Sequence, residues 1–147
     1  MKMMLLVWWL LTGGSASAGP VRVDVVLSTR GDDISFDKQL IEVPSGRRLE
    51  ITFKNEASER SAITHNTVVL LPGTETETFR RLHDVSFDLS QMAGDPGILA
   101  LGTTLAPGDS ETLSLRFPGP GSYPFVCLMP GHGDMMGMRG IIVVRGR

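Results

Sequence analysis

Residues 127–140 read CLMPGHGDMMGMRG, a stretch that begins in the apolar run Ser122 to Leu128 and ends at the run Ile141 to Val144. Both runs contain β-branched or aromatic residues and are bounded by glycine or proline, a composition that favours strands. The stretch is therefore predicted to form a loop that joins two strands. It brings a thiol, an imidazole and several thioethers into one short segment.

Other short strands are predicted along the chain. Apolar and polar residues alternate over 21–25 and over 49–54, which is the period of a strand with one buried face. The runs Leu40 to Val43, Thr67 to Leu71 and Thr112 to Phe117 have a similar composition and end in turn residues. Many short strands separated by turns predict an all-β fold, a sandwich or a barrel.

The segment 74–94 departs from this pattern. Phe79, Leu82 and Val85 follow one another at a spacing closer to that of a helix, and Asp95-Pro96-Gly97 ends the segment. One short surface helix is therefore predicted within residues 74–94. The glycine and proline groups elsewhere are too short for linkers, so the chain after its leader is expected to form one domain.

Composition limits the possible functions. The chain has 147 residues and a formal net charge of −2, which gives no basic excess for binding a phosphate backbone. Nucleic acid is therefore not an expected partner. A single cysteine excludes a disulfide within the chain and any site built from several thiolates of one chain.

The N-terminus has the features of a secretory signal peptide. Lys2 precedes the apolar run Met3 to Leu11, and the small residues Ala16-Ser17-Ala18 follow. The run is too short for a membrane anchor, which needs about 17 or more apolar residues. We expect residues 1–18 to be removed and residues 19–147 to be a periplasmic or otherwise exported domain. In that oxidising setting a lone Cys127 should be buried, paired between molecules or bound to a ligand.

The donors in the loop favour copper. Soft sulfur ligands together with imidazole are typical of the copper site that uses two histidines, one cysteine thiolate and a distant axial methionine. A second histidine must come from His65 or His83. His65 opens the strand-like run 65–70, where a rigid scaffold can hold a ligand, whereas His83 lies in the charged segment Arg80 to Asp84 of the predicted helix. We therefore predict His65 as the second histidine and His83 as a solvated surface residue.

The whole pattern resembles the small blue copper proteins, the plastocyanin and azurin family of cupredoxins. The resemblance covers nearly all of the chain after the leader. Its most specific parts are Tyr123-Pro124-Phe125-Val126-Cys127 and Pro130-Gly131-His132 followed by Met138-Arg139-Gly140, and it extends to three further motifs: Ile41-Glu42-Val43-Pro44-Ser45-Gly46, His65-Asn66 and Leu105-Ala106-Pro107-Gly108-Asp109. It implies a cupredoxin-like Greek-key β-sandwich.

The resemblance also implies a site. One type 1 copper ion would be held by His65, Cys127 and His132 as strong equatorial ligands and by Met138 as the weak axial ligand, with Asn66 bracing the site. The chain departs from azurin-like proteins because it has no second cysteine and carries Leu128, not a hydroxyl residue, after Cys127. Asn66 must therefore brace the site through backbone groups.

The axial ligand has two main candidates, with Met135 a third. The usual azurin-like interval counted forward from the cysteine and histidine leads to Met136, whereas counting back from the final strand leads to Met138. We favour Met138 because the register of a strand is fixed by the side chains that face the core, whereas a glycine-rich loop can absorb an insertion.

The leading functional prediction is an exported, soluble, monomeric one-electron carrier and not an enzyme. It would meet redox partner proteins through a transient interface near His132. The alternative is a periplasmic copper-binding protein for buffering, delivery or resistance, with Met129, Met135 and Met136 as additional thioether contacts for copper(I). A third hypothesis is a structural β-sandwich without metal.

Overall fold

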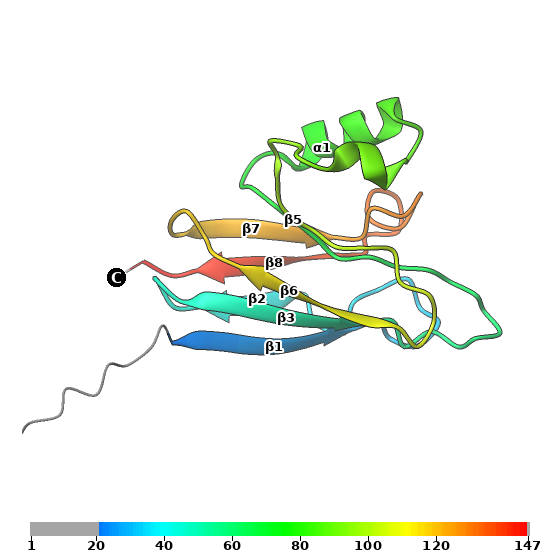
Figure 1. Ribbon diagram of the computed structural model, residues 1–147, viewed down its shortest axis with the longest axis horizontal. Coiled ribbons are helices and arrows are strands. Elements are labelled where there is room, and N and C mark those ends of the chain that lie inside the picture. The colour runs from blue at the N-terminus through cyan, green and yellow to red at the C-terminus, as the bar shows by residue number, and fades with distance from the viewer. Residues whose placement is uncertain (1–20, 147) are drawn as a thin grey trace, which may run out of the picture.

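Two β-sheets face each other in the computed structural model, which describes residues 21–146 (Figure 1). One sheet has three strands in the order β1-β3-β6, and the other has five in the order β2-β8-β7-β4-β5. The first pairs β1 with β3 in parallel, the second pairs β2 with β8 in parallel, and the other pairs are antiparallel. The predicted all-β Greek-key sandwich is confirmed. The expected signal peptide, residues 1–18, lies outside the described residues.

Seven of the eight strands in the described residues overlap runs that were predicted as strands. Their bounds are β1 Arg22–Ser28, β2 Leu40–Val43, β3 Arg48–Lys54, β4 Val68–Leu70, β5 Ile98–Leu101, β6 Ser110–Leu115, β7 Gly121–Val126 and β8 Arg139–Val144. Strand β5 was not predicted. Its sequence ILAL contains leucine and alanine, which lack the β-branched signal, and its residues are all half-buried with no clear alternation.

The main core lies between the sheets because alternate residues of each strand point inward. Leu49, Ile51 and Phe53 of β3 are fully buried, and they meet Phe125 of β7 in one cluster with Cys127. Strand β4 is different, since all three of its residues are buried. Burial of both faces of β4 requires a second layer on the outer side of the five-stranded sheet.

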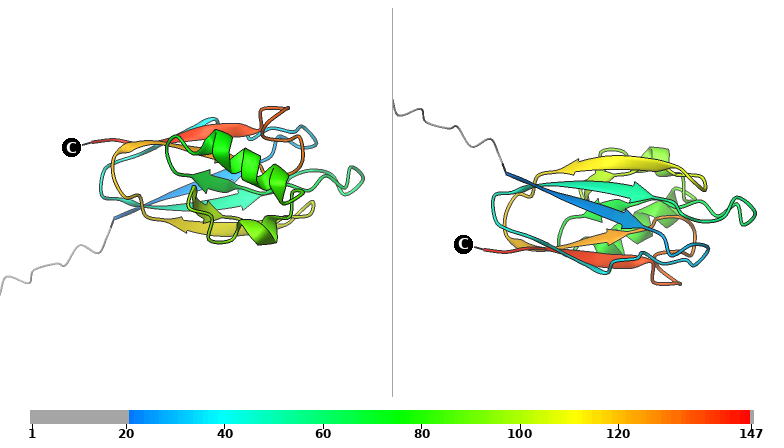
Figure 2. Two further views of the ribbon diagram at one scale, coloured as in Figure 1. Left: turned by 90° about the horizontal axis from the view of Figure 1, so that it is seen from above. Right: turned by 90° about the horizontal axis from the view of Figure 1, so that it is seen from below.

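That second layer is a helical insert between β4 and β5. It contains the helix α1 Glu75–Asp84, which confirms the helix predicted within 74–94, and a short 3₁₀ turn, Leu89–Met92. The insert lies over the five-stranded sheet, as the two turned views show (Figure 2). Leu82 and Met92 of the insert pack with sheet residues in a second core, whose other buried members are Val68, Leu70, Val126 and Leu128.

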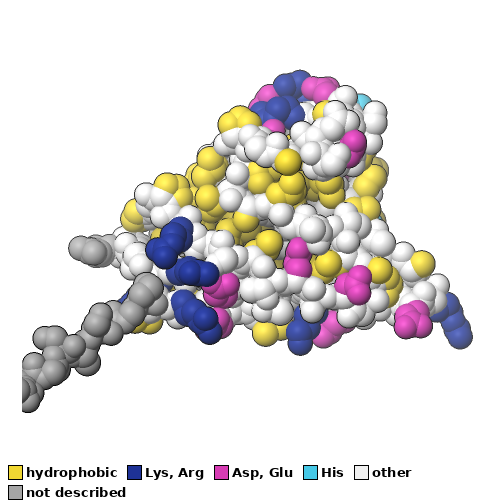
Figure 3. Space-filling view, viewed as in Figure 1, with side chains coloured by type: hydrophobic (Ala, Val, Ile, Leu, Met, Phe, Trp, Pro, Cys, Tyr) yellow, Lys and Arg dark blue, Asp and Glu magenta, His cyan; other side chains and the backbone are white. Residues whose placement is uncertain are grey.

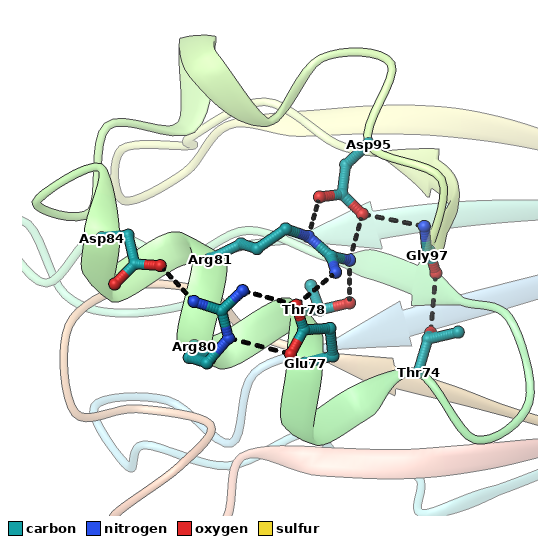
Figure 4. Close-up of polar contacts among 8 residues, drawn as sticks. All are labelled: Thr74, Glu77, Thr78, Arg80, Arg81, Asp84, Asp95 and Gly97. Atoms are coloured by element: carbon teal, nitrogen blue, oxygen red, sulfur yellow. Dashed lines mark hydrogen bonds and ion pairs between the residues drawn. The ribbon is translucent and has the colours of Figure 1, made fainter.

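A polar network fixes α1 to the segment that leads from the insert into β5 (Figure 4). The Arg81 guanidinium donates two hydrogen bonds to the Asp95 carboxylate, at 2.5 and 2.7 Å. Asp95 also accepts from the backbone N–H of Gly97 at 2.8 Å, and the Thr74 hydroxyl donates to the Gly97 carbonyl at 2.9 Å. The Asp95 side chain is only 6% exposed. The Arg81 hydrogen bonds lower the pKa of Asp95 below its ordinary value of 3.8.

The loops cluster at one end of the sandwich, and the chain enters β1 at the opposite end (Figure 1). Lysine and arginine side chains gather near the start of β1, whereas an apolar band lies beneath the insert (Figure 3). Within residues 21–146, no helix has the length and apolar character of a membrane span.

Replacing Asp95 tests the role of this network. The Asp95→Asn variant loses the charge that holds Arg81, and we expect the free energy of unfolding to fall by about 1–3 kcal/mol at neutral pH. A lowered carboxyl pKa stabilises the fold above 3.8 and stops doing so as the pH falls below that value. The difference between the two proteins should therefore shrink in acid. Urea unfolding at several pH values measures it, and Asp84→Asn, on the exposed side of α1, is the control that should change little.

Candidate metal centre

Three metal-ligating side chains meet at the loop-rich end of the sandwich. Cys127 follows β7 directly, His132 lies in the loop between β7 and β8, and His65 lies three residues before β4. Their ligand atoms all lie within 4.8 Å of one another. Two loops that are distant in sequence therefore converge on one small volume.

The geometry suits a single ion. The Cys127 sulfur lies 3.5 Å from Nδ1 of His132 and 4.0 Å from Nδ1 of His65. Bonds of about 2.0–2.3 Å at trigonal angles would place ligand atoms about 3.5–3.8 Å apart. The three atoms thus stand close to the separations that one shared metal requires. Two imidazole nitrogens and a thiolate are also the equatorial donors of a copper electron-transfer site.

Burial sets the protonation of the donors. Cys127 and His65 are fully buried, and His132 is half-buried. Burial, together with the charge of His132, lowers the pKa of His65 to about 4, and burial also lowers the pKa of His132. Both imidazoles are therefore neutral at neutral pH, the form in which they bind metal. Nε2 of His65 is buried and has no hydrogen-bond partner among the described residues.

Burial shifts the pKa of the Cys127 thiol in the direction opposite to that of the imidazoles. Burial raises the pKa of Cys127, while hydrogen bonds from the backbone N–H groups of Asn66 and Met129 act in the opposite direction. A buried thiolate without a cation is costly, and an adjacent metal ion would supply the missing charge. The donors and their surroundings fit a bound soft metal ion.

Asn66 fixes the loop through the backbone, as expected from the absence of a hydroxyl after Cys127. Its Oδ1 accepts a hydrogen bond of 2.7 Å from the N–H of Leu128. Its Nδ2 has no partner among the described residues. The Leu128 side chain points away into the second core, so the residue next to the cysteine connects the site to the helical insert.

The loop of residues 127–138, called the ligand loop below, is closed by hydrogen bonds within its own backbone. The N–H of Met138 donates to the carbonyl of His132 at 2.8 Å, and the N–H of Cys127 donates to the carbonyl of Met138 at 3.0 Å. Gly131 has φ +78°, a left-handed conformation that favours glycine. The insertion between His132 and Met138 is thus accommodated without separating the two residues.

The insert also touches this loop. A Cβ on Gly133 would lie 2.4 Å from the Cys127 carbonyl oxygen and 2.9 Å from the Phe79 ring of α1, so only glycine fits there. Arg139 donates to the Gly133 carbonyl at 3.0 Å and pairs with Glu75 of α1 at 2.5 Å. These contacts were not predicted, because nothing in the sequence places α1 beside the loop.

The methionines proposed as axial ligands differ in how far they are buried. Met138 is fully buried in the same core cluster as Cys127, whereas Met135 is 84% and Met136 is 61% exposed. The structure thus brings His65, Cys127 and His132 together and places Met138 in the core beside them. His83 lies in α1 and is exposed, as predicted.

Comparison with known proteins agrees with this architecture. A family model described as copper binding proteins of the plastocyanin/azurin family matches residues 23–145. Auracyanin-A of Chloroflexus aurantiacus is 29% identical over 126 residues, which cover 82% of this chain and 74% of the relative. Auracyanin-B of the same organism is 24% identical over 116 residues, 77% of this chain and 48% of the relative. The chain therefore spans about half the length of auracyanin-B.

Solved structures show the same fold. The dithionite-reduced auracyanin of the photosynthetic bacterium Roseiflexus castenholzii superposes with a TM-score of 0.68 at 28% identity, covering 84% of this chain and 97% of that one. Auracyanin A of Chloroflexus aurantiacus, described as a "blue" copper protein, gives a TM-score of 0.72 at 23% identity, covering 85% and 100%.

The fold and the donor set define a cupredoxin. The chain belongs to the plastocyanin/azurin family of copper binding proteins. Its cofactor is therefore copper, which the clustered soft donors fit.

The two candidate axial methionines can be distinguished by substitution. Met138→Leu should keep a coloured copper protein but raise its reduction potential, because the axial ligand tunes the potential more than it creates the site. Met136→Leu, at an exposed position, should leave the potential nearly unchanged. Voltammetry of both copper-loaded variants measures this. The opposite pattern would assign the axial role to Met136.

Proposed function

We propose that the protein is an exported type 1 copper protein that carries one electron at a time between redox partners. The single observation that carries the proposal is the cluster of His65, Cys127 and His132, whose ligand atoms lie within 4.8 Å at a loop-rich end. In this proposal these three residues are the equatorial ligands and Met138 is the axial ligand. Bound copper would supply a one-electron couple between copper(I) and copper(II).

The protein's own residues would keep the site rigid. Hydrogen bonds hold the Cys127 and His132 segments to Met138, and Asn66 holds the segment after Cys127. Copper(I) and copper(II) favour different geometries, so a fixed donor frame limits the rearrangement that accompanies electron transfer. All four proposed ligands come from one chain, and this filled set supports a carrier over an enzyme, which needs an open coordination position.

The electron would enter and leave near His132. His65 is fully buried, but His132 is half-buried in a loop that also exposes Met135 and Met136. Transient redox encounters use small interfaces, below about 1,200 Å² in total. Flexible methionines can adapt to more than one partner surface. We propose redox proteins as the partners, with this protein acting as a soluble monomer.

We propose the location of the protein from its expected leader. The signal-peptide features of residues 1–18 support cleavage after Ala18 and a periplasmic or otherwise exported domain of residues 19–147.

Copper handling is the alternative function. Its specific support is the pair of exposed thioethers at Met135 and Met136, which could offer additional weak contacts to copper(I). A delivery protein must release its ion, whereas a carrier must keep it in both oxidation states.

Copper titration of the purified domain tests the proposal. We expect one equivalent of copper(II) to give an intense visible absorption from the copper–thiolate bond, and Cys127→Ser to lose it while keeping the fold, since a hydroxyl does not ionise comparably at neutral pH. The blue protein is then reduced in the presence of a copper(I) chelator. Retention of copper with rapid electron exchange supports a carrier. Prompt loss to the chelator would support copper handling, and an equally blue Cys127→Ser would exclude the proposed site.

The exposed side chains of Met135 and Met136 form a rim beside His132, and placing charge on this methionine rim tests the proposed docking surface. Met136→Lys should slow electron exchange with a redox protein several-fold, because a desolvated lysine opposes close approach, while the visible spectrum stays nearly unchanged. Val26→Lys is the matched control, since Val26 is 50% exposed on β1 of the other sheet. Stopped-flow measurements compare the two. Equal rates would place the electron exit away from this rim.

A further inference from the structure

Asn55 is a buried polar residue outside the ligand set. It follows β3 directly and is only 1% exposed. Its Nδ2 donates to the carbonyl of Ile63 at 2.9 Å and to the carbonyl of Leu105 at 3.0 Å, and its Oδ1 accepts from the N–H of Ala57 at 3.1 Å. Every side-chain donor of Asn55 is thus used to hold backbone carbonyls.

One of those carbonyls also holds the His65 backbone. The Leu105 carbonyl accepts from the N–H of His65 at 3.1 Å, and the N–H of Leu105 donates to the carbonyl of His65 at 2.8 Å. This pair is an isolated bridge outside the named strands, and the next bond between the two segments runs from the N–H of Gly102 to the carbonyl of Thr67 at 3.0 Å. The position of the His65 backbone is therefore coupled to that of Leu105, whose carbonyl Asn55 also holds.

The second carbonyl lies on the chain that leads to His65. Ile63 is two residues before His65, and it follows Ala62, which has φ +55°. A left-handed alanine is unfavourable by roughly 1–2 kcal/mol and persists only where its surroundings impose it. The bond from Asn55 to Ile63 is such a constraint.

The backbone of Asn55 completes the connection between the two loops. Its N–H donates to the carbonyl of Asp109 at 3.0 Å, and its carbonyl accepts from the N–H of Gly108 at 2.8 Å. The loop before His65 and the loop that contains Leu105 are thus both tied to one residue.

We propose that Asn55 is the positioning residue for His65, because its side-chain amide fixes the two backbone carbonyls that set where this ligand stands. This inference rests on the proposed role of His65 as a copper ligand. It predicts that loss of the amide donors changes the His65 side of the site while the Cys127 and His132 side stays in place.

Asn55→Asp is the test variant, because it keeps the oxygen that accepts from Ala57 and, when ionised, places a carboxylate oxygen against the two carbonyls in place of both donors, without a large change of volume. Tyr123→Phe is the matched control. It removes another buried side-chain bond to a backbone carbonyl, that of Gly119 at 2.7 Å, near the β6–β7 turn at the far end of the sandwich.

Amide hydrogen exchange in the copper-free protein gives the first readout, which does not depend on metal. We expect the amides of His65 and Leu105 to exchange at least tenfold faster in Asn55→Asp, and the amide of Ile51 in the middle of β3 to change no more than in Tyr123→Phe. A uniform acceleration at all three amides would mean a purely structural role and overturn the proposal.

The copper-loaded proteins give the second readout. Nitrogen hyperfine couplings should change for one histidine in Asn55→Asp and for neither in Tyr123→Phe. Unchanged couplings would overturn the positioning role, whereas a wild-type protein that binds copper without the thiolate absorption would overturn the proposed function and leave the exchange result standing.

If Asn55→Asp does not fold, the wild-type protein supplies the test. The side-chain amide protons of Asn55 and the backbone amide of His65 should become exposed in one opening event, with the same dependence on denaturant. Rapid exchange of the Asn55 side chain while the His65 amide remains protected would overturn the proposal.

Discussion

The antiparallel pairing of β4 with β7 is the constraint on which the metal centre depends. Val68 lies opposite Val126, so His65, just before β4, and Cys127, just after β7, are brought to the same end of the sheet. The two residues are 62 positions apart in the sequence, yet the sulfur and Nδ1 stand 4.0 Å from each other. A slip of one residue would turn Cys127 from the sandwich core to the outer face and separate the ligands.

Strand β7 and the two residues that follow it contribute side chains to two cores. This explains why a helix is needed beside a copper site. Phe125 and Cys127 face the space between the sheets, whereas Val126 and Leu128 face the insert. Without Leu82 and Met92 the outer face of β4 and β7 would expose a broad apolar surface to water. Covering it also brings Phe79 and Glu75 of α1 against the ligand loop through Gly133 and Arg139. Packing and ligand position are thus set by one arrangement.

Most of the fold was predictable from the sequence because strand alternation and turn residues are local signals. β5 escaped because Ile98–Leu101 has neither alternation nor a β-branched run. The Cys127 and His132 loop was predictable because soft donors are concentrated in one segment, and His65 could be preferred over His83 by its strand-like context. Asn55 could not be found in this way. Its importance depends on carbonyls at residues 63 and 105, and only the folded chain places these within reach of one amide.

The two sides of the proposed site are therefore held by different means. Cys127, His132 and Met138 belong to one loop, closed by its own backbone hydrogen bonds and steadied by α1. His65 comes from another loop, and its own backbone N–H and carbonyl are paired in one bridge with Leu105. Such a bridge has only two hydrogen bonds of its own, and the buried side-chain bonds of Asn55 add to its rigidity. The His65 side of the site thus relies on the buried polar side chain of Asn55, and the loop side relies on its own backbone, on the side chains of Asn66 and Arg139 and on packing against α1.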